Sequence, residues 1–180
     1  YYIAGGPRYV VFILFSTLVT WLMALLIEKA EGKENHKGAR KLLILGLILN
    51  FGMLGIVKYT NFAVENINAL LHLNLRGIQL LLPLGISFYT FQSSGYLLDV
   101  YWKRCKAERH PLKYALFVSF FPQILQGPIG RYSRLADQLY AEHRFEGNNI
   151  IRGFERILWG FFKKMILADW AAAFADAIFE

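Results

Sequence analysis

The sequence contains few of the residues from which disulfides, metal sites and nucleotide-binding motifs are built. Its one cysteine, Cys105, excludes an internal disulfide and any multi-cysteine metal site. It also has no serine elbow, no Walker loop and no dinucleotide fingerprint. No metal is expected, because no histidine has a second ligand at metal-binding spacing; the histidines are His36, His72, His110 and His143.

Charge is missing from the first long apolar run. Tyr9 to Ile27 contains no charged residue. About 19 residues at a rise of 1.5 Å give roughly 28 Å, which is enough to cross the hydrocarbon core of a bilayer. The whole chain is 56% hydrophobic and 16% aromatic, above the composition of an ordinary soluble domain. These features predict a membrane protein.

Two further apolar runs predict two more spanning helices. Leu42 to Val57 is short, but Lys41 and Lys58 can reach the two interfaces from its ends. Leu80 to Trp102 is longer and has Pro83 near its start, where the missing N–H is tolerated. The predicted spans are therefore about 9–27, 42–57 and 80–102.

The basic residues lie between the apolar runs and predict the orientation. The net charge is +7, and the positive-inside rule places the loops 28–41 and 103–113 in the cytoplasm. Between them, Tyr59 to Arg76 has an amphipathic pattern typical of a helix in the outer interface. The basic loops lack a nucleic-acid-binding fold, so we expect the bilayer as partner and no nucleic acid.

The remaining segments complete an all-α, polytopic arrangement. Residues 114–130 are predicted to be re-entrant, because their apolar part is too short to cross and is flanked by basic residues on both sides. Pro122, Gly127 and Pro128 also break helical hydrogen bonding there. Residues 149–180 are predicted to form an interfacial helix that turns into the membrane. We expect residues 1–180 to be one membrane-embedded unit.

Polar side chains on the third predicted span are the first candidates for a site. Tyr89, Gln92, Tyr96 and Asp99 fall within one helical stripe that ends at Lys103. The stripe is typical of a polar cavity lining. It is equally typical of adhesion between helices, with Asp99 paired to Lys103.

A second set of candidates accompanies the re-entrant segment and the last apolar run. Gln123, Gln126 and Arg131 offer amide and guanidinium donors that could bind a carbonyl or phosphate group. The alternative is that they satisfy the broken backbone around them. Asp169 borders the last apolar run, and Asp176 follows it on the same helical face.

Three blocks resemble the membrane-bound O-acyltransferase (MBOAT) superfamily, in the branch of alginate O-acetylase and teichoic-acid D-alanyl transferase. The first block is LPLGISFYTFQ at 82–92, which ends in LDVY at 98–101. The second comprises FVSFFPQ at 117–123 and QGPIGRY at 126–132. The third comprises LWGFFKK at 158–164 and LAD at 167–169.

The resemblance implies a ring of tilted helices around a thin centre. The acyl donor would enter from the cytoplasm and the acceptor hydroxyl from outside. The catalytic residue in such proteins is a histidine of a later helix. We expect that helix beyond Glu180, because none of the four histidines here stands in a matching context. The sequence also starts without a methionine, so we expect it to be an excerpt. Without the helix that carries the histidine, we expect this excerpt to be inactive alone. The residues of both candidate sets would then line or support the tunnel.

The resulting functional hypothesis is acyl transfer in the cell's inner membrane by a multi-pass protein. An acyl group, acetyl by preference, would pass from acetyl-CoA or another acyl thioester to an exported polysaccharide or to a downstream acyl-carrying partner protein. No bound cofactor is expected. D-alanyl transfer to teichoic acid is one alternative. A transporter or flippase subunit is another, because broken helices also form transport sites, although the inverted repeat often found there is missing.

Overall fold

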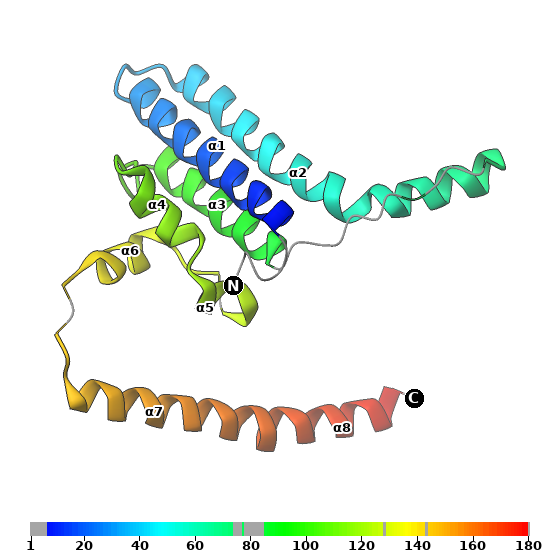
Figure 1. Ribbon diagram of the computed structural model, residues 1–180, viewed down its shortest axis with the longest axis vertical. Helices are drawn as coiled ribbons and strands as arrows, with labels where there is room; N and C mark the ends of the chain where they lie inside the picture. The colour runs from blue at the N-terminus through cyan, green and yellow to red at the C-terminus, as the bar shows by residue number, and fades with distance from the viewer. Residues whose placement is uncertain (1–6, 74–76, 78–84, 128, 143, 180) are drawn as a thin grey trace. The chain divides into compact units, whose positions relative to one another are not determined.

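The computed structural model describes residues 7–73, 77, 85–127, 129–142 and 144–179, and the regular structure in them is entirely helical, as predicted (Figure 1). The elements are α1 (Pro7–Glu31), α2 (His36–Leu71), α3 (Ile86–Tyr101), α4 (Pro111–Val118), α5 (Phe121–Gln126), α6 (Tyr132–Tyr140), α7 (Gly147–Phe162), the π-helix η1 (Lys163–Ala168) and α8 (Asp169–Phe179). They form two compact units, residues 1–141 and 142–180. The sequence predicted a single membrane-embedded unit for residues 1–180, and this division stays a prediction.

Helices α1, α2 and α3 pack side by side in the first unit (Figure 1). A short turn joins α1 to α2, and Asn35 caps α2 by accepting a hydrogen bond from the Gly38 N–H at 2.9 Å. At the contact between helices, a Cβ on Gly46 would lie 2.9 Å from Leu97 Cδ1 of α3. Glycine at this position therefore lets α2 and α3 approach closely.

A buried polar cluster joins α1 to α2. Ser16 Oγ donates to Asn50 Oδ1 at 2.6 Å, and Asn50 Nδ2 donates to Thr20 Oγ1 and to the Gly46 carbonyl, both at 3.0 Å. All three side chains are buried. The amide of Asn50 is thus satisfied entirely within the α1–α2 hairpin.

Helix α2 differs from the sequence prediction at its C-terminal half. The prediction was a span at 42–57 followed by a separate amphipathic helix at 59–76, but one helix continues to Leu71 and ends at His72 in the left-handed conformation. No glycine or proline follows Gly55 within α2, so nothing interrupts its hydrogen bonds. In Figure 1 the amphipathic part changes direction and extends away from the bundle. Residues 74–76 lie outside the described part.

Two of the described helices, α1 over Val10–Glu31 and α2, are long and apolar enough to cross a membrane. Helix α3 has 16 described residues. The predicted third span starts at Leu80, and residues 80–84 lie outside the described part of the chain. The third span therefore stays a prediction.

Residues 111–126 form two short helices. Pro111 begins α4, which ends at Val118, and Pro122 stands in the first turn of α5. The 8 residues of α4 extend about 12 Å, well short of a bilayer core of about 30 Å. The backbone break is the feature on which the re-entrant prediction depended, and the depth of this segment in a membrane stays a prediction.

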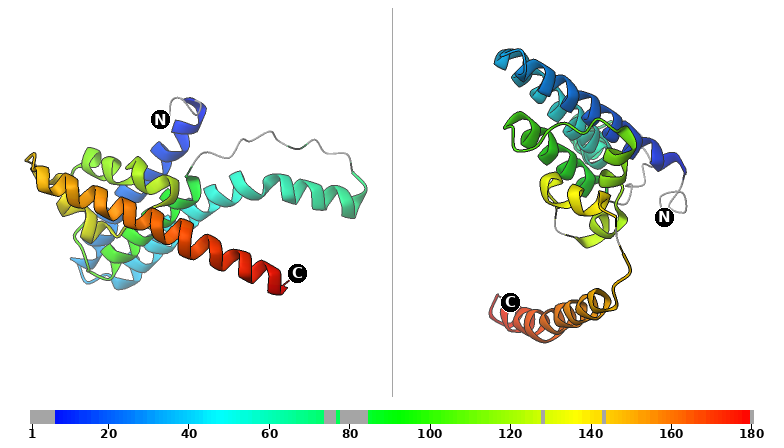
Figure 2. Two further views of the ribbon diagram at one scale, coloured as in Figure 1. Left: turned by 90° about the horizontal axis from the view of Figure 1, so that it is seen from below. Right: turned by 90° about the vertical axis from the view of Figure 1, so that its left-hand side faces the viewer.

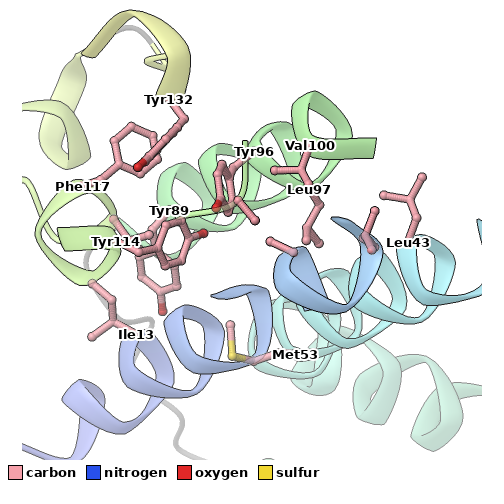
Figure 3. Close-up of a cluster of buried hydrophobic side chains, with 14 of the residues drawn as sticks. Ile13, Leu43, Met53, Tyr89, Tyr96, Leu97, Val100, Tyr114, Phe117 and Tyr132 are labelled. Atoms are coloured by element: carbon pink, nitrogen blue, oxygen red, sulfur yellow. The ribbon is translucent and has the colours of Figure 1, made fainter. Parts of the chain in front are cut away.

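An aromatic cluster holds α4 and α6 against α3 (Figure 3). The ring of Tyr96 lies 4.6 Å from that of Tyr114 and 4.7 Å from that of Tyr132, measured between centroids. Phe117 meets Tyr132 edge-on at 5.0 Å. Tyr114 and Phe117 are fully buried, so this cluster fixes the segment after α3 in place.

The second unit consists of α7, η1 and α8, which follow one another without a break (Figure 2). No side chain of α7 or η1 is buried, although one face carries Ile150, Phe154, Ile157 and Phe161. Such an apolar face suits the predicted interfacial position. A turn into the membrane near Met165 stays a prediction.

Candidate functional site

The first unit contains a cavity of about 220 Å³ between α3 and the segment after α5. Buried Gln92 and Asp99 line it together with exposed Trp102 and Ile129, so it opens to the surface. Three residues predicted from two separate parts of the sequence, Gln92, Asp99 and Arg131, line it together. The remaining lining residues are Gly95, Leu98, Trp102, Arg104, Ile129 and Gly130. We refer to it as the interior cavity.

Gln123 is held beside this cavity by Gln92. The Gln92 Nε2 donates to Gln123 Oε1 and to the Phe117 carbonyl, each at 3.2 Å. A Cβ on Gly130 would lie 2.6 Å from the Gln123 Nε2, so a larger residue at position 130 would move that amide. The two glutamines thus connect α3 to both α4 and α5. The amide that satisfies a backbone carbonyl is that of Gln92, a residue for which no sequence pattern indicated this role.

Asp99 is 5% exposed and faces the half-exposed Arg104. Arg104 Nη1 lies 3.6 Å from Asp99 Oδ1, and the guanidinium carbon lies 4.6 Å from the centroid of the Trp102 ring. The pairing of Asp99 with Lys103 is wrong. Lys103 takes a positive φ of 58° after the helix ends, and its Nζ lies 3.1 Å from Glu31 Oε2.

The predicted stripe on α3 divides into two faces. Tyr89 and Tyr96 are buried in the core, whereas Gln92 and Asp99 line the interior cavity. Offsets of 3 and 10 residues place Gln92 and Asp99 about 60–80° around the helix from Tyr89, while an offset of 7 leaves Tyr96 within about 20° of it. The stripe was too wide to act as one surface.

The two other candidates do not join this group. The side chain of Gln126 lies outside the described part, and its residue ends α5. Asp169 belongs to the second unit, where both of its carboxylate oxygens accept from Lys164 Nζ at 2.8 Å.

No pattern in the sequence indicated Glu108, yet this residue fixes the loop after α3. Its carboxylate accepts from Tyr132 Oη at 2.7 Å and from the His110 N–H at 2.8 Å. Its backbone N–H donates to Tyr96 Oη, and its carbonyl accepts from Trp21 Nε1. Burial alone would raise the pKa of Glu108, but these hydrogen bonds to the carboxylate hold it below its ordinary value.

A second cavity of about 580 Å³, which we call the basin, lies at the ends of α1 and α3. Its lining residues are Glu28, Glu31, Gly32, Val100, Lys103, Arg104, Cys105 and Lys106. Burial raises the pKa of the Cys105 thiol to about 11, with Asp99 and Glu28 adding to the effect. Cys105 is therefore a neutral thiol near pH 7 and a poor nucleophile.

The side chains that line the interior cavity can bind a ligand. Amide and guanidinium donors meet at the interior cavity, and such groups bind carbonyl oxygens or anions. None of the described histidines lines either cavity. In the described part of the chain, no group of three or more His, Cys, Asp or Glu side chains could hold a metal ion.

Comparison with known proteins gives several curated relatives. The chain is 36% identical over 172 residues to a probable alginate O-acetylase of Pseudomonas syringae pv. tomato, matching 92% of this chain and 33% of that protein. It is 38% identical over 150 residues to a probable alginate O-acetylase of Pseudomonas aeruginosa, matching 79% of this chain and 28% of that protein. A peptidoglycan O-acetyltransferase of Helicobacter pylori is 33% identical over 206 residues, matching 100% of this chain and 38% of that protein.

The chain therefore spans about a third of the length of the curated relatives that it matches. No family model matches the chain. No solved structure matches it either.

Proposed function

Since the chain belongs to the MBOAT-type O-acetyltransferase family, we propose that the whole protein transfers an acetyl group to hydroxyls of an exported polysaccharide. The names of the relatives support this proposal, because they give alginate and peptidoglycan as the polymers that are acetylated on oxygen. They favour acetyl transfer over the D-alanyl alternative.

The single observation that carries the proposal to this chain is the interior cavity. Gln92 belongs to the first matching block and Arg131 to the second, and both line this one cavity. In the proposed reaction the Arg131 guanidinium would orient the acyl carbonyl and stabilise charge that develops on its oxygen. Both N–H groups of the Gln92 amide are already bonded, so Gln92 would support the site by holding Gln123 beside the cavity. The general base would be the histidine that the resemblance implies beyond Glu180.

We place the donor on the side of the two basic loops. Two ion pairs join these loops, one between Glu31 and Lys103 and the other between Glu28 and Arg109. Both loops therefore lie at the same end of the bundle, which supports the predicted cytoplasmic position of both. The donor would be acetyl-CoA or another acyl thioester, and the protein would be a multi-pass protein of the inner membrane.

Arg131→Ala and Gln123→Ala in the full-length protein test this function. Each is expected to lower acetylation of the polysaccharide by about 10- to 1,000-fold, the usual effect of one positioning or charge-stabilising group. Acetyl released from the isolated polymer by mild base is the measurement. Arg134→Ala is the matched control, because Arg134 is exposed and does not line the interior cavity.

Normal acetylation in both variants at normal protein levels would show that these side chains are only scaffold. An unacetylated polymer in cells with the intact gene, together with measurable solute transport, would favour a transporter instead.

A further inference from the structure

Arg104 lines both the basin and the interior cavity. Its backbone N–H donates to the Asp99 carbonyl at 2.8 Å, which fixes the residue at the end of α3. Its side chain is half-exposed and lies over Trp102. The Arg104 guanidinium therefore lies between the basin and the interior cavity.

The charges around the basin leave Arg104 and Lys106 available to an anion. Glu31 is taken by Lys103 and His36, at 3.1 and 2.9 Å. Glu28 is taken by Arg109 and by the Ala107 N–H. Within the described residues, Lys106 has no acidic partner.

The ion pair between Arg104 and Asp99 is loose. The 3.6 Å between Arg104 Nη1 and Asp99 Oδ1 exceeds the usual distance of about 2.7–2.9 Å in a charge-assisted hydrogen bond. Asp99 is nevertheless buried, so its charge acts on Arg104 through a medium that screens poorly. An anion in the basin would have to compete with this carboxylate for the same guanidinium.

We propose that the basin binds a phosphate group of the acyl donor, and that Arg104 holds this phosphate in exchange for the Asp99 carboxylate. This assignment rests on the proposed function for the identity of the donor. The planar guanidinium suits a bidentate contact with phosphate, and Lys106 adds a second positive charge. Because Arg104 also lines the interior cavity, its movement would join the phosphate site to the place where the acyl group is to be positioned.

The native Cys105 provides a reporter that does not depend on acyl transfer, since it lines the basin and is the chain's one cysteine. Purified full-length protein, with its own cysteines elsewhere replaced, is alkylated with a neutral maleimide at about pH 9, where enough thiolate forms to follow the rate. Pyrophosphate is titrated at constant ionic strength, and the concentration that halves the alkylation rate is measured. Coenzyme A with its thiol methylated, so that it cannot consume the maleimide, is titrated in a parallel series.

Two variants should shift this concentration in opposite directions. Arg104→Ala is expected to raise it by about tenfold, because the phosphate loses its guanidinium. Asp99→Asn is expected to lower it by about threefold or more, because the competing carboxylate is gone while the side-chain shape is kept. Arg104→Lys should fall between wild type and Arg104→Ala. Lys33 is a basic residue at the same end of the helix bundle and does not line the basin. Lys33→Ala should therefore leave the half-protecting concentration unchanged.

An unchanged value in Asp99→Asn, or a shift of both variants in the same direction, would overturn the exchange. Phosphatidylglycerol vesicles alone are also tested for slowing of the alkylation of Cys105. If they slow it, and the methylated coenzyme A has no further effect, the phosphate belongs to a lipid headgroup and the donor assignment is overturned. Normal protection in a protein that acetylates no polysaccharide would refute the proposed function while leaving a phosphate site in the basin.

Discussion

Glu108 shows how a single residue in a loop can connect several helices. Through its carboxylate, N–H and carbonyl it contacts Tyr132 of α6, Tyr96 of α3 and Trp21 of α1. The basin and the interior cavity both lie beside the end of α3, where this loop begins. The loop that follows Arg104 is therefore held by a residue that lines neither cavity.

The thiol of Cys105 gives a pH-dependent prediction. Burial raises its pKa to about 11, so the thiolate fraction at lower pH is small and rises about tenfold with each pH unit. Alkylation of the folded protein, followed by mass spectrometry, is expected to accelerate through about pH 10 without levelling. In the unfolded chain the rate should level off near the ordinary thiol pKa of about 8.5. A plateau near that value in the folded protein would contradict the raised pKa.

The sequence indicated which residue types would serve at a polar site more reliably than on which side of the helix each residue lies. Gln92, Asp99 and Arg131 could be selected as candidates because each is a strong hydrogen-bonding group beside apolar sequence, and all three line the interior cavity. Their role in a tunnel stays a prediction. Tyr89 and Tyr96 were placed with them, but a rotation of about 60° separates core from cavity on a helix. Arg104 was overlooked, because its role depends on the αL turn at Lys103, which no sequence pattern indicated.

At the scale of the elements, the start of α3 depends on the glycine that precedes its first turn. Gly85 precedes α3 with a φ of 77°, and a Cβ there would overlap with the Ile124 Cγ2 of α5. Gly85→Ala is expected to destabilise the protein by about 2–4 kcal/mol, through left-handed strain and overpacking. Thermal unfolding in detergent, followed by circular dichroism, measures this as a lower midpoint.

Gly55→Ala is the matched control for this change. No atom lies within 4 Å of a Cβ at Gly55, which stands inside α2, so alanine should be neutral or stabilising by up to about 1 kcal/mol. Equal midpoints for the two variants would show that the contact between Gly85 and Ile124 is not needed for folding.

The helices themselves followed from apolar length and from the positions of proline and glycine. The predicted spans 9–27 and 42–57 lie within α1 and α2, and the break within 114–130 appears between α4 and α5. The uninterrupted α2 was not predicted, because a change from an apolar to an amphipathic pattern was interpreted as a helix end. That change alters the environment of a helix without removing any backbone hydrogen bond.

For the molecule as a whole, the two basic loops should face the cytoplasm together. In cells carrying a Cys105→Ala background without other cysteines, Lys37→Cys and Lys106→Cys are expected to react with an impermeant maleimide only after permeabilisation. Asn68→Cys, in the amphipathic part of α2, should react in intact cells. Labelling of positions 37 and 106 on opposite sides would contradict the ion pairs that join their loops.

The cluster of Ser16, Thr20 and Asn50 also bears on how the chain enters a bilayer during synthesis. An asparagine amide released alone into hydrocarbon would leave its donors and acceptor without partners. In the α1–α2 hairpin every one of these groups is already bonded, without help from α3. If α1 and α2 span a bilayer as predicted, we expect them to enter it as a pair, because the hairpin is the smallest portion of the first unit in which the buried Asn50 amide has all these partners.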